Sequence, residues 1–119
     1  MTRLEKDREK EIQAMISSMT LEEKVSQMLH DSPAADSAGL PEYNWWSECL
    51  HGVARAGTAT VFPEPIGLAA TFDPKLAQKE AGSISDEARA KYNEAVRAGV
   101  RTQYRGLTFW TPNINIFRD

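Results

Sequence analysis

The feature that most constrains this chain is residues 43–52, which read Tyr-Asn-Trp-Trp-Ser-Glu-Cys-Leu-His-Gly. The segment holds two of the three tryptophans, the only cysteine, one of the two histidines and the carboxylate Glu48. Indole rings stack on flat apolar surfaces, including the C–H faces of sugar rings, and a carboxylate accepts hydrogen bonds from hydroxyl groups. Two interpretations follow: a carbohydrate-binding pocket, or a core cluster whose acid is held in a salt bridge.

Length and composition set the class of protein. A chain of 119 residues is one domain at most, and 41% hydrophobic with 26% charged residues is typical of a globular rather than a disordered protein. The formal net charge of −3 comes without a basic stripe, so we expect no nucleic-acid binding. A single cysteine makes no internal disulfide, so the sequence does not require an oxidising compartment.

The first ten residues are mostly charged and contain no apolar run, which is unlike a secretory signal peptide. No stretch approaches the roughly 18 consecutive apolar residues of a membrane span. We therefore expect no membrane association, and the charged start favours the cytoplasm, with export of the full-length protein as the alternative.

Three helices are expected from periodicity and capping signals. Residues 3–18 form a charge-dense helix with a narrow apolar stripe. Thr20 and Glu23 make a capping box that opens a second helix, and Asp73-Pro74 is a strong start for a third, running to about Tyr92. The apolar faces predicted for the three helices are, in turn, Ile12, Met15, Ile16 and Met19; Leu21, Val25, Met28 and Leu29, of which Met28 is expected in the core; and Leu76, Ala77, Ala81, Ile84 and Ala88.

Strands are expected between these helices. Residues 31–42 have loop composition, residues 57–63 predict a turn and a short strand stopped by proline, and residues 66–71 and 107–110 predict buried strands. A strand, a helix and a strand with a crossover of this length form a βαβ unit, which implies a parallel sheet. The expected class is α/β, and the few elements do not close an architecture.

Candidate catalytic groups are few. Glycoside hydrolysis uses two carboxylates about 5–5.5 Å apart for retention or about 6.5–9.5 Å apart for inversion. The candidates are Glu42, Glu48, Glu64, Asp73 and Asp86. Asp73 is expected as a helix cap and the others, apart from Glu48, lie in solvated settings, so we identify no catalytic pair in this chain.

Metal and nucleophile chemistry find little support. His30 and His51 lack metal-ligand spacing, and with one cysteine a zinc site is not expected. Cys49 is interpreted as a small buried hydrophobe and His51 as a hydrogen-bonded structural histidine. We therefore expect no metal and no cofactor.

Several ordered segments resemble glycoside hydrolase family 3. They are MTLEEK at 19–24, NWWSECLHGVA at 44–54, ATVFP at 59–63, IGLAATFDP at 66–74, ISDEARAKY at 84–92 and GLTFWTPNINIFRD at 106–119. The resemblance covers roughly residues 12–119. The tryptophan pair followed by a glutamate is similar to the β-xylosidase-like branch, with β-glucosidases and arabinofuranosidases left open.

The resemblance implies a (β/α)8 barrel domain, with residues 1–19 as a leading helix and residues 20–119 as the first βα units. It implies retaining hydrolysis of terminal β-linked sugars of oligosaccharides. Glu48 matches the family's substrate-binding carboxylate, and Trp110 matches an aromatic position of the same subsite. Trp45 and Trp46 are further substrate-binding candidates, of which at least one is expected in the core.

The resemblance also implies that the barrel is incomplete here. A full barrel takes about 250 residues, and no residue of this chain matches the family's aspartate nucleophile or glutamate acid/base. We expect the chain alone to be inactive and a second polypeptide to complete the barrel. The alternatives are a non-catalytic helical interaction protein, an inert fragment and, with few convergent contacts in its favour, a stand-alone sugar-binding module.

Overall fold

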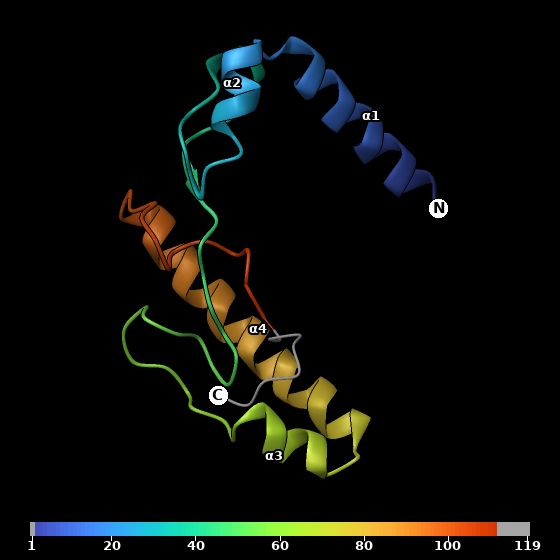
Figure 1. Cartoon of the computed structure of the whole chain (residues 1–119), viewed down its shortest axis with the longest axis vertical. Helices are drawn as coiled ribbons and strands as arrows, with labels where there is room; N and C mark the ends of the chain where they lie inside the picture. Colours follow the sequence, from blue (N-terminus) through green and yellow to red (C-terminus); the bar gives the residue numbers. More distant parts are fainter. Residues whose placement is uncertain (1, 112–119) are drawn as a thin grey trace. The chain divides into compact units, whose positions relative to one another are not determined.

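The computed structural model describes residues 2–111 of the chain and divides it into two compact units, Met1–Tyr43 and Asn44–Asp119. The first unit is built mainly from two helices, and the second from two further helices and the loops around them (Figure 1). The elements, in chain order, are α1 (Arg3–Ser18), α2 (Leu21–Ser26), β1 (Asp31–Ser32), the 3-10 helix η1 (Asp36–Ala38), β2 (Tyr43–Asn44), α3 (Pro65–Ala70) and α4 (Pro74–Arg97).

Helix α1 matches the predicted range, and α1 and α2 each begin with a capping box. Thr20 accepts the backbone N–H of Glu23, and the Glu23 carboxylate accepts the N–H of Thr20. The same carboxylate accepts the hydroxyl of Ser37 in η1, and these hydrogen bonds, led by that of Ser37, lower the pKa of Glu23. The cap therefore also ties α2 to η1.

The apolar faces of α1 and α2 are less covered than the sequence predicts. Of the α1 stripe, only Met19 is buried, while Ile12, Met15 and Ile16 are 41–50% exposed. The prediction that Met28 lies in the core is wrong, because this side chain is 78% exposed. Helix α2 has only six residues, so its apolar positions do not form a long continuous face.

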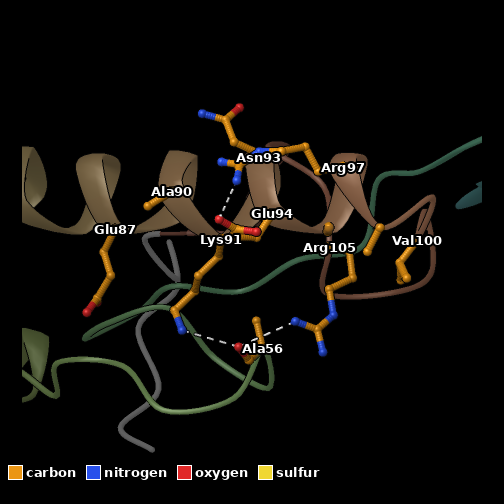
Figure 2. Close-up of a pocket in the computed structure, with 11 residues that line it drawn as sticks. Ala56, Glu87, Ala90, Lys91, Asn93, Glu94, Arg97, Val100 and Arg105 are labelled. Carbon is orange, nitrogen blue, oxygen red and sulfur yellow. Dashed lines mark hydrogen bonds and ion pairs between the residues drawn. The ribbon is translucent and has the colours of Figure 1, made fainter.

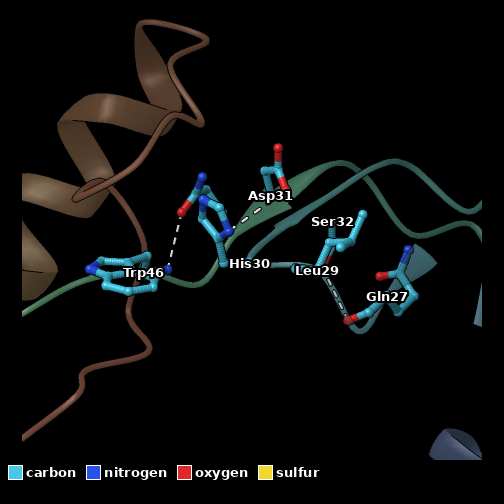
Figure 3. A network of polar contacts seen from close by, with 7 residues as sticks. Gln27, Leu29, His30, Asp31, Ser32 and Trp46 are labelled. Atoms are coloured by element: carbon cyan, nitrogen blue, oxygen red, sulfur yellow. Dashed lines mark hydrogen bonds and ion pairs between the residues drawn. The ribbon is translucent and has the colours of Figure 1, made fainter. Parts of the chain in front are cut away.

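The segment predicted as a loop, residues 31–42, contains short regular pieces. β1 and β2 form a two-stranded sheet, and η1 lies between them in sequence. The buried hydroxyl of Ser32 donates to the carbonyl of Leu29 at 2.7 Å and to that of Gln27 at 3.3 Å, and the Nδ1 of His30 lies 3.8 Å from the carboxylate of Asp31 (Figure 3). The hydroxyl of Ser32 thus supplies hydrogen bonds to backbone carbonyls that follow the end of α2.

The second unit is organised by α4, which begins where Asp73-Pro74 predicts. The Asp73 carboxylate accepts the backbone N–H groups of Lys75 and Leu76 at 3.0 and 3.1 Å. The helix continues five residues past the predicted end at Tyr92, because the sequence up to Arg97 contains no helix breaker. Its buried residues are Ile84, Ala88 and Ala95, of which Ile84 and Ala88 join the core cluster with Cys49, Val53 and Ala56.

Three predicted strands are not formed. Residues 66–71 were expected as a buried strand, but Pro65–Ala70 is helix α3, with Pro65 at its first position. Short apolar runs of small residues suit either conformation, and a proline at the first helical position favours the helix. Residues 57–63 contain no strand, since residues on this loop bond instead to side chains of α4.

Residues 107–110 also do not make a full strand. Only Phe109 pairs, in a single parallel bridge with Ser47. Of the predicted parallel sheet, only this single bridge joins segments on either side of α4 within residues 2–111, and its first partner is Ser47 rather than residues 66–71. The sequence of residues 111–115 predicts a break after this segment, and all of these residues except Thr111 lie outside the described residues. Within residues 2–111, no helix combines the length and apolar character that crossing a bilayer requires.

Candidate functional site

The side chains of residues 46–49 alternate between two environments, which is the pattern of an extended chain. Ser47 and Cys49 are buried at 1% and 9% exposure, whereas Trp46 is 36% exposed and Glu48 is partly exposed. Successive side chains of an extended chain point to opposite sides. The alternation places Trp46 and Glu48 together on the outer side, while Cys49 packs against α4 in the core.

Backbone hydrogen bonds hold this segment against residues 104–110. The carbonyl of Ser47 accepts the N–H of Trp110 at 2.9 Å, and the carbonyl of Trp46 accepts the N–H of Tyr104 at 2.9 Å. The N–H of Trp46 donates to the side chain of Asn44 at 3.1 Å (Figure 3). These bonds bring Trp110, distant in sequence, beside the tryptophan pair.

The three tryptophans form one stacked group. The ring of Trp110 lies 5.5 Å from that of Trp45 at an interplanar angle of 19°, and 5.5 Å from that of Trp46 at 27°. Offset-stacked rings at this separation are the favoured arrangement for aromatic pairs. Trp110 remains 56% exposed and Trp45 is half-buried, so the group presents indole surface to solvent.

Glu48 adjoins this stacked group. Its Oε1 accepts the indole N–H of Trp46 at 3.1 Å, and its Oε2 lies 4.0 Å from the Nε of Arg55, with 36% of the Glu48 side chain exposed. The carboxylate is therefore oriented by two partners while part of it faces solvent. The acid is in an ion pair, as the core interpretation predicts, but neither Trp45 nor Trp46 belongs to the buried core, so the expectation that one of them does is wrong. The carbohydrate-binding interpretation stays a prediction.

All four predicted substrate-binding residues thus lie in one cluster, comprising Glu48, Trp45, Trp46 and Trp110. Their role in binding stays a prediction. Arg55 and Tyr104 also belong to the cluster, and the sequence analysis missed both. The guanidinium of Arg55 lies 5.4 Å from the centroid of the Tyr104 ring. No motif or spacing rule identifies this pair, because it depends on the left-handed backbone of both residues, with φ of 57° and 65°.

Cys49 is in the core, and His51, whose side chain is 37% exposed, follows it in the segment. Burial raises the pKa of the Cys49 thiol, and a hydrogen bond from Thr111 opposes this only in part. The Nδ1 of His51 lies 3.1 Å from the carbonyl oxygen of Phe62, and its Nε2 lies 3.7 Å from Glu64. The interpretation of Cys49 as a buried hydrophobe and of His51 as a hydrogen-bonded histidine is confirmed.

A groove of ≈ 400 Å³ lies on the other side of the segment, lined mainly by apolar side chains that include Cys49, Leu68, Ile84 and Phe109. It offers few groups for catalysis. Within residues 2–111, no group of three or more His, Cys, Asp or Glu side chains is arranged to hold a metal ion.

Comparison with known proteins points to xylosidases. The chain is 48% identical over 107 residues to a xylan 1,4-beta-xylosidase of Xylanibacter ruminicola, which covers 88% of this chain and 12% of that protein. It is 46% identical to a probable exo-1,4-beta-xylosidase of Aspergillus fumigatus (90% of this chain, 14% of that protein) and 45% identical to probable beta-D-xylosidase 7 of Arabidopsis thaliana (88% and 14%).

The chain is therefore similar, over about nine-tenths of its length, to proteins named as glycosidases, and it spans only about one-seventh or less of their length. No family model matches the chain.

Proposed function

We propose that this chain supplies substrate-binding residues of a β-xylosidase of glycoside hydrolase family 3, an enzyme that removes terminal β-linked xylose from oligosaccharides. The observation that carries the proposal is the 44–48% identity to proteins named xylosidases in a bacterium, fungi and a plant. The cluster of Glu48 with three tryptophans supports it, because carboxylates bind sugar hydroxyls and indoles stack on sugar rings.

In this proposal the carboxylate accepts hydrogen bonds from the sugar, and the indole rings supply a surface on which it packs. Glu48 accepts hydrogen bonds from hydroxyl groups of the terminal sugar through its exposed part. Trp110, together with Trp46, offers the apolar surface against which the sugar ring packs. In this proposal bond cleavage is performed by carboxylates outside this chain, in the remainder of a (β/α)8 barrel of which this chain forms one part. That remainder is a second polypeptide or a further length of the same protein.

The test is a transplant. The 119-residue chain replaces the matching segment of the Xylanibacter ruminicola xylosidase, and hydrolysis of an aryl β-xyloside and an aryl β-glucoside is measured. The chain alone is assayed in parallel. We expect xyloside hydrolysis by the chimera and none by the chain alone. A folded chimera without activity refutes the proposal, and activity of the chain alone refutes the division of roles.

Glu48 is tested within the same chimera. Loss of a hydrogen bond to a charged acceptor costs about 1.5–3 kcal/mol, so Glu48→Gln is expected to lower kcat/KM roughly tenfold to hundredfold. Glu42→Gln, the same change at an exposed loop position, is the matched control and should leave kcat/KM within about twofold. Equal effects of the two substitutions would exclude a binding role for Glu48.

A further inference from the structure

Glu48 belongs to a closed ring of four residues. Trp46 donates its indole N–H to one carboxylate oxygen of Glu48, and Arg55 faces the other oxygen. The guanidinium of Arg55 in turn lies over the ring of Tyr104, and the backbone N–H of Tyr104 donates to the carbonyl of Trp46. Each member is therefore held by two others, and the ring returns to the residue where it began.

Two members of this ring have unusual backbone conformations. Arg55 and Tyr104 adopt positive φ, as does only one other non-glycine residue, Phe72, within residues 2–111. Such conformations are unfavourable for residues with a β-carbon and persist where surrounding contacts over-determine them. Here they bring the cation of Arg55 between the carboxylate of Glu48 and the aromatic face of Tyr104, where a guanidinium is favoured on both sides.

The loop that carries Arg55 is fastened to α4. The carbonyl of Ala56, the next residue, accepts hydrogen bonds from Lys91 at 3.2 Å and from Arg105 at 3.5 Å, as Figure 2 shows. Lys91 also donates to the carbonyl of Thr58, and the Glu87 carboxylate accepts the N–H of Thr60 at 3.1 Å. The backbone of Arg55 is thus anchored while its side chain, 67% exposed, depends on Glu48 and Tyr104 for its position.

We propose that Arg55 is a positioning residue for Glu48: through the Tyr104 ring it holds the carboxylate in the orientation in which Trp46 and substrate hydroxyls are both satisfied. Arg55 does not contact the reacting bond in this view. The proposal rests on the proposed function for its kinetic consequence, but the orientation of Glu48 can be measured without any enzymatic activity.

The first measurement uses the 119-residue chain itself. The indole N–H resonance of Trp46 is assigned in a 1H–15N correlation spectrum with Trp46→Phe. We expect Glu48→Gln and Arg55→Gln both to shift this resonance in the same direction, because both release the hydrogen bond from its fixed acceptor. Arg97→Gln, which removes an exposed arginine paired with Glu94 near the end of α4, should not move it. An unchanged Trp46 resonance in folded Arg55→Gln overturns the proposal.

The second measurement uses the xylosidase chimera. Because exposed ion pairs contribute at most about a fivefold factor in an equilibrium, Arg55→Gln is expected to raise KM about threefold to fivefold with kcat nearly unchanged. Arg55→Lys should restore part of the loss. In the Glu48→Gln background, Arg55→Gln should have no further effect, whereas additive losses would overturn the positioning role.

Tyr104 provides variants that leave the charges intact. Tyr104→Phe retains the aromatic face and should match the unsubstituted chain in both measurements, while Tyr104→Leu should reproduce Arg55→Gln. Equal behaviour of the two Tyr104 variants overturns the proposal even if Arg55→Gln does not fold. An inactive chimera combined with the expected Trp46 shifts refutes the proposed function and leaves the positioning role standing.

Discussion

Gly52 is the last residue of the segment 43–52, and we expect its replacement by alanine to cause a large loss of stability. Its φ is 128°, and a β-carbon built at this position would lie 2.1 Å from the carbonyl oxygen of Thr60. Gly52→Ala therefore introduces backbone strain and a clash with a backbone atom that no rotamer change can relieve. Moving the Thr60 segment would also disturb the nearby hydrogen bond from the N–H of Phe62 to the carbonyl of His51, 2.8 Å long.

The expected cost follows from these two effects. A non-glycine residue in a disfavoured φ region costs about 1–3 kcal/mol, and weakening one backbone hydrogen bond costs about 0.5–1.5 kcal/mol. Together they predict destabilisation of about 2–4 kcal/mol for Gly52→Ala, a large fraction of the stability of a small domain. The assay is urea unfolding of the 119-residue chain followed by tryptophan fluorescence.

Substitutions at two other glycines separate the cost of backbone strain from the cost of the clash with Thr60. Gly57 has a φ of 83° with no atom within 4 Å of a built β-carbon, so Gly57→Ala should show the strain alone, about 1 kcal/mol. Gly82 lies inside α4 with similarly open space, so Gly82→Ala should stabilise the chain by about 0.5–1 kcal/mol. If Gly52→Ala destabilises the chain no more than Gly57→Ala, the close approach to Thr60 is refuted.

Three further predictions use the same chain. Asp73→Ala should destabilise it by about 1 kcal/mol in urea unfolding and Asp73→Asn by much less, since an amide oxygen still caps the N–H groups of α4; equal losses would count against capping. Cys49 should react with a thiol-specific disulfide reagent much more slowly in the folded chain than in urea, because burial raises the pKa of its thiol. The pKa of the Cys49 thiol is higher in the folded than in the unfolded chain, so the contribution of the thiol to stability is complete below the unfolded pKa and is lost as the pH rises through the folded pKa. The free energy of unfolding should therefore fall in alkaline solution. Cys49→Ala should remove the part of this pH dependence that comes from the thiol.

Helix starts could be predicted from the sequence because their determinants are local. The capping box of Thr20 and the Asp73-Pro74 start each involve residues at most three positions apart. The wrong prediction of a strand at residues 66–71 also has a local cause. Glu64-Pro65 places a proline at a first helical position as Asp73-Pro74 does, and this signal outweighs the apolar run that suggested a strand.

Pairing between distant segments was less predictable. The sequence indicated a buried apolar segment at 107–110, but pairing is confined to Phe109 and its partner is Ser47. Strand formation depends on a neighbouring strand, so an apolar pattern alone does not determine it. The aromatic residues and the acid of the candidate site could be named from residue type and from the family resemblance, whereas Arg55 and Tyr104 could not, because positive φ at both residues brings them together.

The candidate site and the core share one extended segment, and this couples stability to function. Ser47 and Cys49 are buried, whereas Trp46 and Glu48 are more exposed. Because alternate side chains of an extended segment point to opposite sides, the position of one pair determines that of the other. A slip of one residue would bury the acid and expose the core. The hydrogen bonds of Tyr104 to Trp46 and of Trp110 to Ser47 oppose that slip. Trp46 and Tyr104, which help to orient Glu48, therefore also fix the register of the segment that carries Cys49 into the core.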